Sequence, residues 1–244
     1  HKHQWQGRDC PINPRLSGLV VQTRVSSCCH VLKRCHKGIS MQINDPKANK
    51  KEDEIFILGS GSPRRKELLS QVLPDFKVIV SNADELTTHP DGPITLVQEN
   101  ARLKAESVAQ LHPDCWVLGA DTLVTLNDRV LGKPKSIEEG CSMLHLLSGQ
   151  THTVSTGLCM INLEKKYEVC KVDSSRVTFK QLTDPVIDEY FAEVNPLDKA
   201  GAYAIQTRPD LIIQKFEGSR TNVIGLPLEL LAGWLDELGI SKRG

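Results

Sequence analysis

The sequence lacks most of the features that assign a function directly. No apolar run approaches the length of about 20 residues that a membrane-crossing helix needs, so we expect no membrane partner. No GxxxxGK(S/T) motif occurs, which excludes a P-loop nucleotide hydrolase. His152 has no convincing Ser or Cys partner, so no hydrolytic triad is predicted. What remains is a chain of 244 residues, 39% of them hydrophobic, that can bury a sizeable core.

Net charge is also lacking, but the zero total hides an asymmetry. Residues 1–40 hold seven of the 30 Lys and Arg residues and one of the 30 acids. Residues 41–244 therefore carry 23 basic and 29 acidic side chains, a net charge of −6. A nucleic-acid surface needs a clustered positive face, so we expect no nucleic-acid partner. A small polyanion needs only a local positive pocket.

Cysteine forms no CxxC pair anywhere in the chain. Four cysteines of the body look like small core residues, and nothing suggests secretion, which favours a reducing compartment and the cytoplasm: Cys115, Cys141, Cys159 and Cys170. The other four lie in the first 40 residues near two histidines. A metal site there is the alternative, but the spacing matches no zinc pattern.

Residues 1–54 show no sustained periodicity, and Met41 is a plausible start of the protein. The first 40 residues are then translated upstream sequence or, alternatively, an organelle presequence, and we favour the first interpretation. We expect residues 1–54 to be a disordered or non-native extension and residues 55–240 to form the functional domain.

From Ile55 onward strands and helices alternate, which predicts an α/β fold. The expected strands are Ile55–Leu58, Phe76–Ser81, Trp116–Leu126, Ala202–Gln206 and Leu211–Phe216. The expected helices are Pro63–Leu73, Ile94–Leu111, Ile137–Leu147, Pro185–Val194 and Pro227–Leu238. Two β-rich stretches, Thr151–Leu163 and Tyr167–Leu182, indicate an antiparallel hairpin, near which a second lobe should begin.

The most informative segment is the helix start at Ser62 and Pro63, which follows a Gly/Ser loop. Ser62 suits the N-cap and Pro63 the first helical position. Arg64 and Arg65 then lie in the first turn, where the helix dipole makes each cation unfavourable by roughly 0.3–1 kcal/mol. Loop N–H groups and two guanidinium groups at one point suit a phosphate chain. A solvated, basic helix start is the alternative.

Asp121 lies in an otherwise apolar strand, where a carboxylate needs a cation, a metal ion or hydrogen bonds. It can act as a general base or a metal ligand, with Gly119 and Ala120 leaving room for a ligand. The alternative is a surface acid at the end of the strand. Thr122 can bind a substrate edge or simply be a β-branched strand residue.

Further polar residues are candidates with ordinary alternatives. Lys104 shares a helix stripe with apolar residues, so it faces inward or extends along the core edge. Lys133 lies in a Gly/Pro loop that projects its ammonium group, unless it is a plain turn lysine. Asp84 and Glu85 can bind a divalent cation or be solvated loop acids.

A small-residue stretch at 197–206 would let backbone approach a ligand closely, and the amide of Gln206 can read a base. Together these cations, acids and polar groups predict a nucleotide site.

These stretches resemble the Maf family of nucleoside triphosphate pyrophosphatases over nearly all of Ile55–Leu238. The resemblance rests on LGSGSPRRKELL, ENARLKA, LGADTLV, LGKP, MLHLLSGQTHTVSTG, DKAGAYAIQ and NVIGLPL, which occur in the family's order. It implies a two-lobed α/β fold, a mixed sheet flanked by helices with a deep central cleft. It also implies a homodimer that hydrolyses a nucleoside triphosphate to the monophosphate and pyrophosphate with Mg2+, or with Mn2+ or Co2+.

The resemblance also implies roles by position. Asp121 matches the acid that activates water, and with Glu85 it would hold the metal ion; Lys104 and Lys133 complete the catalytic group. The residues expected to bind substrate are Ser60, Ser62, Arg64, Arg65, Thr122, Asp198, Lys199 and Gln206. Among them, Arg64, Thr122 and Gln206 match positions of substrate choice and resemble the dTTP/UTP branch.

One departure bears on substrate choice. That branch usually has Gly after the AYAIQ stretch, whereas Thr207, Arg208 and Pro209 follow here, and their bulk and charge would alter selection of the base or sugar. The alternatives are a pyrophosphatase for 7-methyl-GTP or another modified nucleotide, and a nucleotide-binding regulator of cell division or septum formation.

Overall fold

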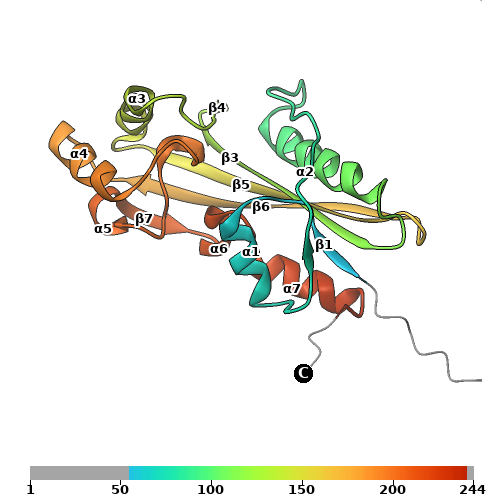
Figure 1. Ribbon diagram of the computed structural model, residues 1–244. Helices are drawn as coiled ribbons and strands as arrows, with labels where there is room; N and C mark the ends of the chain where they lie inside the picture. The colour runs from blue at the N-terminus through green and yellow to red at the C-terminus, as the bar shows by residue number, and fades with distance from the viewer. Residues whose placement is uncertain (1–54, 241–244) are drawn as a thin grey trace, which may run out of the picture. The chain divides into compact units, whose positions relative to one another are not determined.

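A mixed sheet of seven strands forms the centre of the computed structural model, which describes residues 55–240 (Figure 1). The sheet order is β2-β1-β3-β5-β6-β7, and β4 pairs with β3. The strands are β1 (Phe56–Leu58), β2 (Lys77–Val78), β3 (Trp116–Leu126), β4 (Arg129–Leu131), β5 (Thr151–Asn162), β6 (Tyr167–Phe179) and β7 (Ile213–Glu217). β1 is parallel to β2 and β3, and the other pairs are antiparallel. The predicted α/β class is confirmed.

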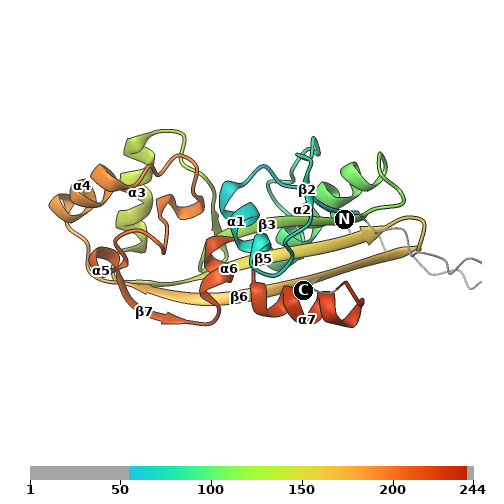
Figure 2. The ribbon, with the colours of Figure 1, turned by 60° about the horizontal axis from the view of Figure 1, so that its bottom comes forward.

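Helices cover both faces of this sheet (Figures 1 and 2). The helix α2 (Pro93–Ala109) covers one face, and α1 (Pro63–Ser70), α6 (Arg220–Ile224) and α7 (Leu228–Glu237) lie on the other. The helices α3 (Ile137–Leu147), α4 (Asp184–Glu193) and α5 (Pro209–Ile212) gather at one end of the long strands, with the 3-10 turn η1 (Ala200–Ala202). In the described part of the chain, no helix is long and apolar enough to span a membrane.

Three apolar clusters follow from the alternation of side chains along the long strands. One lies between the sheet and α1 and α7 and includes Leu118 and Trp234. A second lies between the sheet and α2 and includes Val117 and Ala105. The third fills the end that carries α3 and α4 and includes Val124 and Leu144. β3 contributes to all three clusters, so its central residues lie where the clusters meet.

Two strand glycines bring α2 unusually close to the sheet. A Cβ atom on Gly119 would lie 2.2 Å from the carbonyl oxygen of Ala101 and 2.6 Å from the backbone nitrogen of Ala105. A Cβ atom on Gly157 would lie 2.5 Å from the carbonyl oxygen of Val97. No side chain fits at either position unless the helix moves away.

The structure corrects several of the expected elements. The expected strand Ala202–Gln206 is wrong: Gly201 and Ala202 have φ values of 68° and 63°, and the chain turns there instead of extending. The expected strand Phe76–Ser81 shortens to β2. β4, α5 and α6 were not predicted, although the turn between β3 and β4 carries Asn127 and Asp128 at positive φ, as a tight hairpin requires.

The expected start of a second lobe near Thr151 is also wrong. The third cluster already includes the end of β3 and helix α3, which precede Thr151 in the chain. Residues 1–54, with the extension predicted there, lie outside the described residues.

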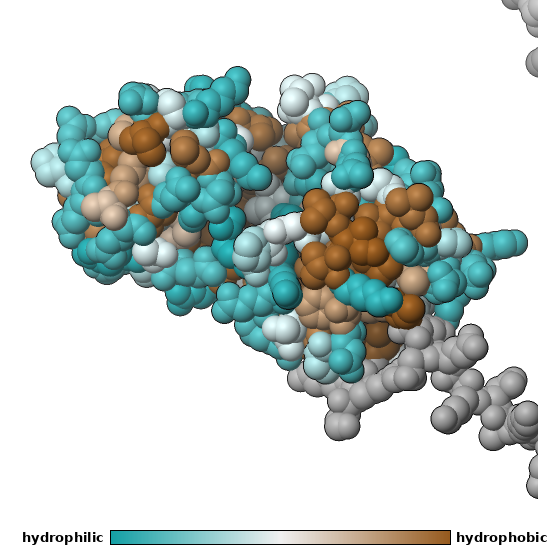
Figure 3. Space-filling view, in the orientation of Figure 1, coloured by the Kyte–Doolittle hydropathy of each residue, from teal (hydrophilic) through white to brown (hydrophobic). Residues whose placement is uncertain are grey.

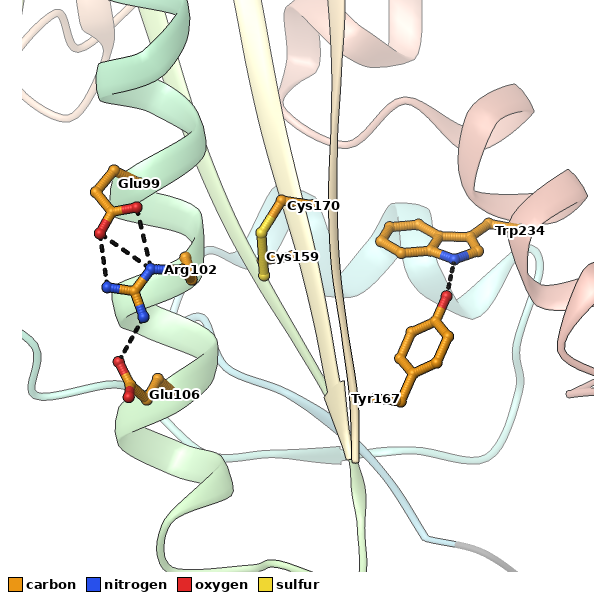
Figure 4. Close-up of a disulfide and its surroundings, with 7 residues drawn as sticks. All are labelled: Glu99, Arg102, Glu106, Cys159, Tyr167, Cys170 and Trp234. Carbon is orange, nitrogen blue, oxygen red and sulfur yellow. Dashed lines mark hydrogen bonds and ion pairs between the residues drawn. A yellow bond between two sulfur atoms is a disulfide. The ribbon is translucent and has the colours of Figure 1, made fainter. Parts of the chain in front are cut away.

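Two cysteines are paired rather than isolated. Cys159 and Cys170 face each other across β5 and β6 and form a disulfide (Figure 4). The prediction of separate core residues is therefore wrong for this pair, whereas Cys115 is a buried free thiol as expected. Figure 4 also shows the ion pairs of Arg102 with Glu99 and Glu106 along α2.

Because α2 lies so close to the sheet, a single methyl group added to β3 should destabilise the protein. We expect Gly119→Ala to lower the free energy of unfolding by about 1–3 kcal/mol, because the methyl group collides with helix backbone. Gly233→Ala on α7 is the control, since no atom lies within 4 Å of its added Cβ. That change should stabilise the helix by about 0.5–1 kcal/mol. Chemical denaturation measures both; equal effects would contradict the packing account.

Candidate active site

The start of α1 has the predicted geometry, whereas in the Gly/Ser loop the N–H groups of Gly59 and Ser62 are already bonded to Leu118 O and Ser60 Oγ. The side chain of Ser62 caps the helix by accepting a hydrogen bond from the backbone N–H of Arg65, and Pro63 is the first helical residue. Arg64 and Arg65 therefore lie in the first turn, as the sequence predicts.

Arg65 is held as a fixed fork by three neighbours. Its Nε donates to the carbonyl oxygen of Gly225 (2.9 Å), Nη1 to Ser60 Oγ (3.1 Å) and Nη2 to Thr122 Oγ1 (2.9 Å). A guanidinium group has five N–H donors, so one on each terminal nitrogen stays available for an anion. Burial lowers the pKa of Arg65, with Asp121 opposing and Arg64 adding to the shift. A phosphate bound through two hydrogen bonds would replace the water contacts that the Arg65 guanidinium group loses on burial.

Thr122 connects Arg65 to a buried polar network. Its hydroxyl lies 3.0 Å from that of Thr156, which donates to the carbonyl oxygen of Asn222 on α6 (2.9 Å). Asn222 in turn donates to Val154 and Ser175, so α6 and the Gly225 carbonyl that follows it are fixed to the sheet. In this structure the Thr122 hydroxyl therefore positions Arg65.

Asp121 projects from β3 toward α2 and is only 6% exposed, which rules out a surface turn acid. Lys104 Nζ lies 2.7 Å from Asp121 Oδ1 and 3.0 Å from Glu85 Oε1. Lys104 thus faces inward and bridges two carboxylates from separate segments.

Asn100 is a buried residue near the site that the sequence reasoning missed. Its Nδ2 lies 3.4 Å from Asp121 Oδ2, and its side chain exchanges two hydrogen bonds with the backbone of Leu86. The available signal was its position one helical turn before Lys104, where a polar residue shares the stripe that faces the sheet.

On the opposite side, Arg64 contacts the segment that follows α4. Arg64 Nη1 donates to Asp198 Oδ2 (3.0 Å), and Lys199 pairs with the other oxygen of the same carboxylate. Burial alone would raise the pKa of Asp198, but the hydrogen bonds from Lys199 and Arg64 outweigh it and hold that pKa below its usual value.

These groups surround one cavity of about 590 Å³, and Figure 3 shows the surface hollowed between the α3–α4 end and the part that carries α1 and α2. All twelve residues predicted for the site line it: Ser60, Ser62, Arg64, Arg65, Glu85, Lys104, Asp121, Thr122, Lys133, Asp198, Lys199 and Gln206. The volume is in the range of small-molecule sites. Asp84, the other candidate acid, is not among the lining residues.

Arg208 does not take part in this cavity. It pairs with Glu189 (3.0 Å) and Glu193 on α4, and the hydrogen bonds that it donates to these acids raise its pKa. Thr207 and Pro209 are also absent from the lining. The expectation that these three residues alter base selection therefore finds no support in the geometry.

The acids of the cavity suit a metal ion that is shared with a ligand. Glu85 and Asp121 both contact Lys104, and among residues 55–240 no group of three or more His, Cys, Asp or Glu side chains gathers to hold a metal. Mg2+ commonly binds one or two carboxylates and takes its other ligands from phosphates and water. The donor set fits that arrangement rather than a dedicated protein cage.

Comparison with known proteins shows one family over most of the chain. A family model described as Maf-like protein matches residues 55–238. A dTTP/UTP pyrophosphatase of Bacillus cytotoxicus is 46% identical over 176 residues, which cover 72% of this chain and 91% of that protein. A dTTP/UTP pyrophosphatase of Bacillus cereus (strain B4264) is 44% identical over 185 residues, which cover 76% of this chain and 96% of the relative.

The fixed fork of Arg65 predicts that charge alone cannot replace it. We expect Arg65→Lys to weaken binding of inorganic triphosphate by about tenfold or more, or about 1.4 kcal/mol, because an ammonium group cannot offer two parallel donors. Isothermal titration calorimetry measures the affinity. Arg208→Lys is the control, since Arg208 lies outside the cavity and pairs with acids of α4 and α5. Equal losses in the two variants would show that the fork has no special role.

Proposed function

The chain belongs to the Maf-like protein family, and on that premise we propose that it hydrolyses dTTP and UTP to the nucleoside monophosphate and pyrophosphate. The single observation that carries the proposal is the cavity itself. Arg64 and Arg65 lie on one side of it, and the buried Asp121 lies beside Lys104 on the other. Such a site can bind a phosphate chain at its cations and place a water molecule against an acid.

Binding of the triphosphate would use the cations in different ways. The two remaining N–H donors of Arg65 form a bidentate contact with phosphate oxygens, and Arg64 adds a second guanidinium group. Lys133 and Lys199 supply point charges from the loops on the opposite wall. The fixed positions of these groups hold the α-phosphorus in one place.

In the chemical step, Asp121 takes a proton from water as the oxygen attacks the α-phosphorus. The bond between that phosphorus and the α–β bridging oxygen breaks, and pyrophosphate leaves with the bonding electrons. Lys104, 2.7 Å from Asp121, orients the carboxylate for this transfer. The arginines and lysines stabilise the negative charge that develops on the leaving group.

We also propose a divalent cation, Mg2+ or alternatively Mn2+ or Co2+, held by Asp121 and Glu85 together with oxygens of the substrate. When bound, it would neutralise charge on the phosphates. The support is the donor set, because two carboxylates beside one lysine leave the remaining ligand positions for substrate and water.

A homodimer in the cytoplasm completes the proposal. The sheet edge at β2 exposes an apolar side chain, Val78, which is 40% exposed, and Figure 3 shows apolar residues gathered over the segment around β2. An apolar patch on an edge strand suits a second copy of the chain. Nucleoside triphosphates are intracellular metabolites, which supports the cytoplasm, whereas the Cys159–Cys170 disulfide is the observation against it, because such bonds are rare in reducing compartments.

A panel of triphosphates tests the reaction. With Mg2+, we expect pyrophosphate release from dTTP and UTP, and a fall in kcat/KM of about 10²-fold or more in Asp121→Asn because the base is lost. Asp236→Asn on α7, outside the cavity, is the matched control. The panel includes CTP, 7-methyl-GTP and modified pyrimidine triphosphates. Preferential turnover of 7-methyl-GTP would show that the substrate is a modified purine nucleotide and not dTTP or UTP. Tight binding without turnover would favour a nucleotide-binding regulator.

Selection of the base tests the role of Gln206. If its amide reads the pyrimidine, Gln206→Glu should change the ratio of kcat/KM values between dTTP, UTP and CTP by about tenfold, because the carboxylate offers no donor. Gln214→Glu on the exposed strand β7 has the same chemistry outside the cavity. An unchanged rank order of nucleotides in Gln206→Glu would rule out this reading.

A further inference from the structure

Asn100 is buried at the centre of the site without lining the cavity. Its exposed fraction is 2%, and it lies on α2 one turn before Lys104. Since it is not among the cavity-lining residues, it has no direct route to a substrate. Any effect of Asn100 on the reaction must act through other residues.

Its first contacts fix the segment that carries Glu85. Asn100 Oδ1 accepts a hydrogen bond from the backbone N–H of Leu86 (2.8 Å), and Nδ2 donates to the carbonyl oxygen of the same residue (3.1 Å). The side chain of Glu85 itself is 56% exposed and pairs only with Lys104 among the described contacts. Its placement therefore depends on how firmly the neighbouring backbone is held.

Its third contact reaches the proposed general base. Asn100 Nδ2 lies 3.4 Å from Asp121 Oδ2, while Lys104 binds Oδ1. The two residues of α2 thus hold the two oxygens of one carboxylate. The donor pattern also fixes the amide orientation, because Leu86 offers an N–H to its oxygen and two acceptors face its nitrogen.

We propose that Asn100 is a positioning residue that fixes the carboxylates of Glu85 and Asp121 relative to each other in the cavity. The inference rests on the proposed pyrophosphatase function. One buried amide group makes three hydrogen bonds to two separate segments, and no apolar or hydroxyl side chain can do so. The distance between the two carboxylates then depends on α2 rather than on the loop that follows β2.

The chain offers a matched control for this amide. Asn162 is also buried, accepts from the backbone N–H of Lys165 (2.9 Å) and donates to the carbonyl oxygen of Asp114 (3.3 Å). It lies at the end of β5, where the hairpin to β6 begins, and does not line the cavity. Asn100→Ser and Asn162→Ser therefore remove equivalent groups at two places.

Two measurements follow on the full chain. With dTTP and Mg2+, we expect Asn100→Ser to lower kcat by about 10- to 100-fold with KM changed less than threefold, because the phosphate-binding cations are untouched. Amide hydrogen exchange without substrate should be at least tenfold faster at Leu86. Asn162→Ser should leave kcat and Leu86 exchange unchanged while lowering the thermal midpoint.

The outcomes separate this inference from the proposed function. If the wild-type chain hydrolyses dTTP but Asn100→Ser retains its kcat, or both variants lose kcat equally, the positioning role is wrong. If the wild type hydrolyses nothing, the proposed function fails, and Leu86 exchange alone still decides whether Asn100 holds the segment. Should Asn100→Ser not fold, Asn100→Gln, which keeps the amide but moves it by one methylene group without adding charge, is compared with Asn162→Gln in the same assays.

Discussion

Helix α2 brings Asn100 and Lys104 within hydrogen-bonding distance of Asp121 only because β3 has no side chain at Gly119. A helix usually rests on a sheet through a layer of side chains, whereas here helix backbone lies against strand backbone. The small residues Ala101 and Ala105 on the facing side of the helix permit the same approach. The chemistry of the cavity is therefore set by a packing constraint one residue away from the acid.

The same arrangement keeps three charged groups, Arg65, Lys104 and Asp121, largely away from water. Desolvation of an ion costs several kcal/mol, and a buried pair returns that cost only when its geometry is good. Lys104 and Asp121 meet at 2.7 Å, and Arg65 has three acceptors, so each group keeps partners without a ligand. Apolar clusters on both faces of the sheet supply the stability that such a site lacks.

The sequence predicted those parts of the site whose signals are local. Ser62 and Pro63 define a helix start by their own chemistry, and Asp121 stands out in an apolar strand. The helix stripe could have marked Asn100 as facing the sheet, but its role could not be assigned, because its partners Leu86 and Asp121 are brought to it by tertiary packing. For the same reason the pairing of Cys159 with Cys170 depends on strand register, which spacing alone does not reveal.

The ion pair between Arg64 and Asp198 bears on the length of phosphate chain that the cavity prefers. Without a ligand, Arg64 is already bound by Asp198, which also holds Lys199. A phosphate group that uses Arg64 must compete with this carboxylate, and an exposed ion pair of this kind is worth only about 0–1 kcal/mol. A single phosphate gains little from the exchange. A triphosphate reaches Arg64 while its other oxygens bind the preset fork of Arg65, so its additional contacts outweigh the loss. Under the proposed function, the Arg64–Asp198 pair would therefore favour a long phosphate chain over the shorter anions that the reaction releases.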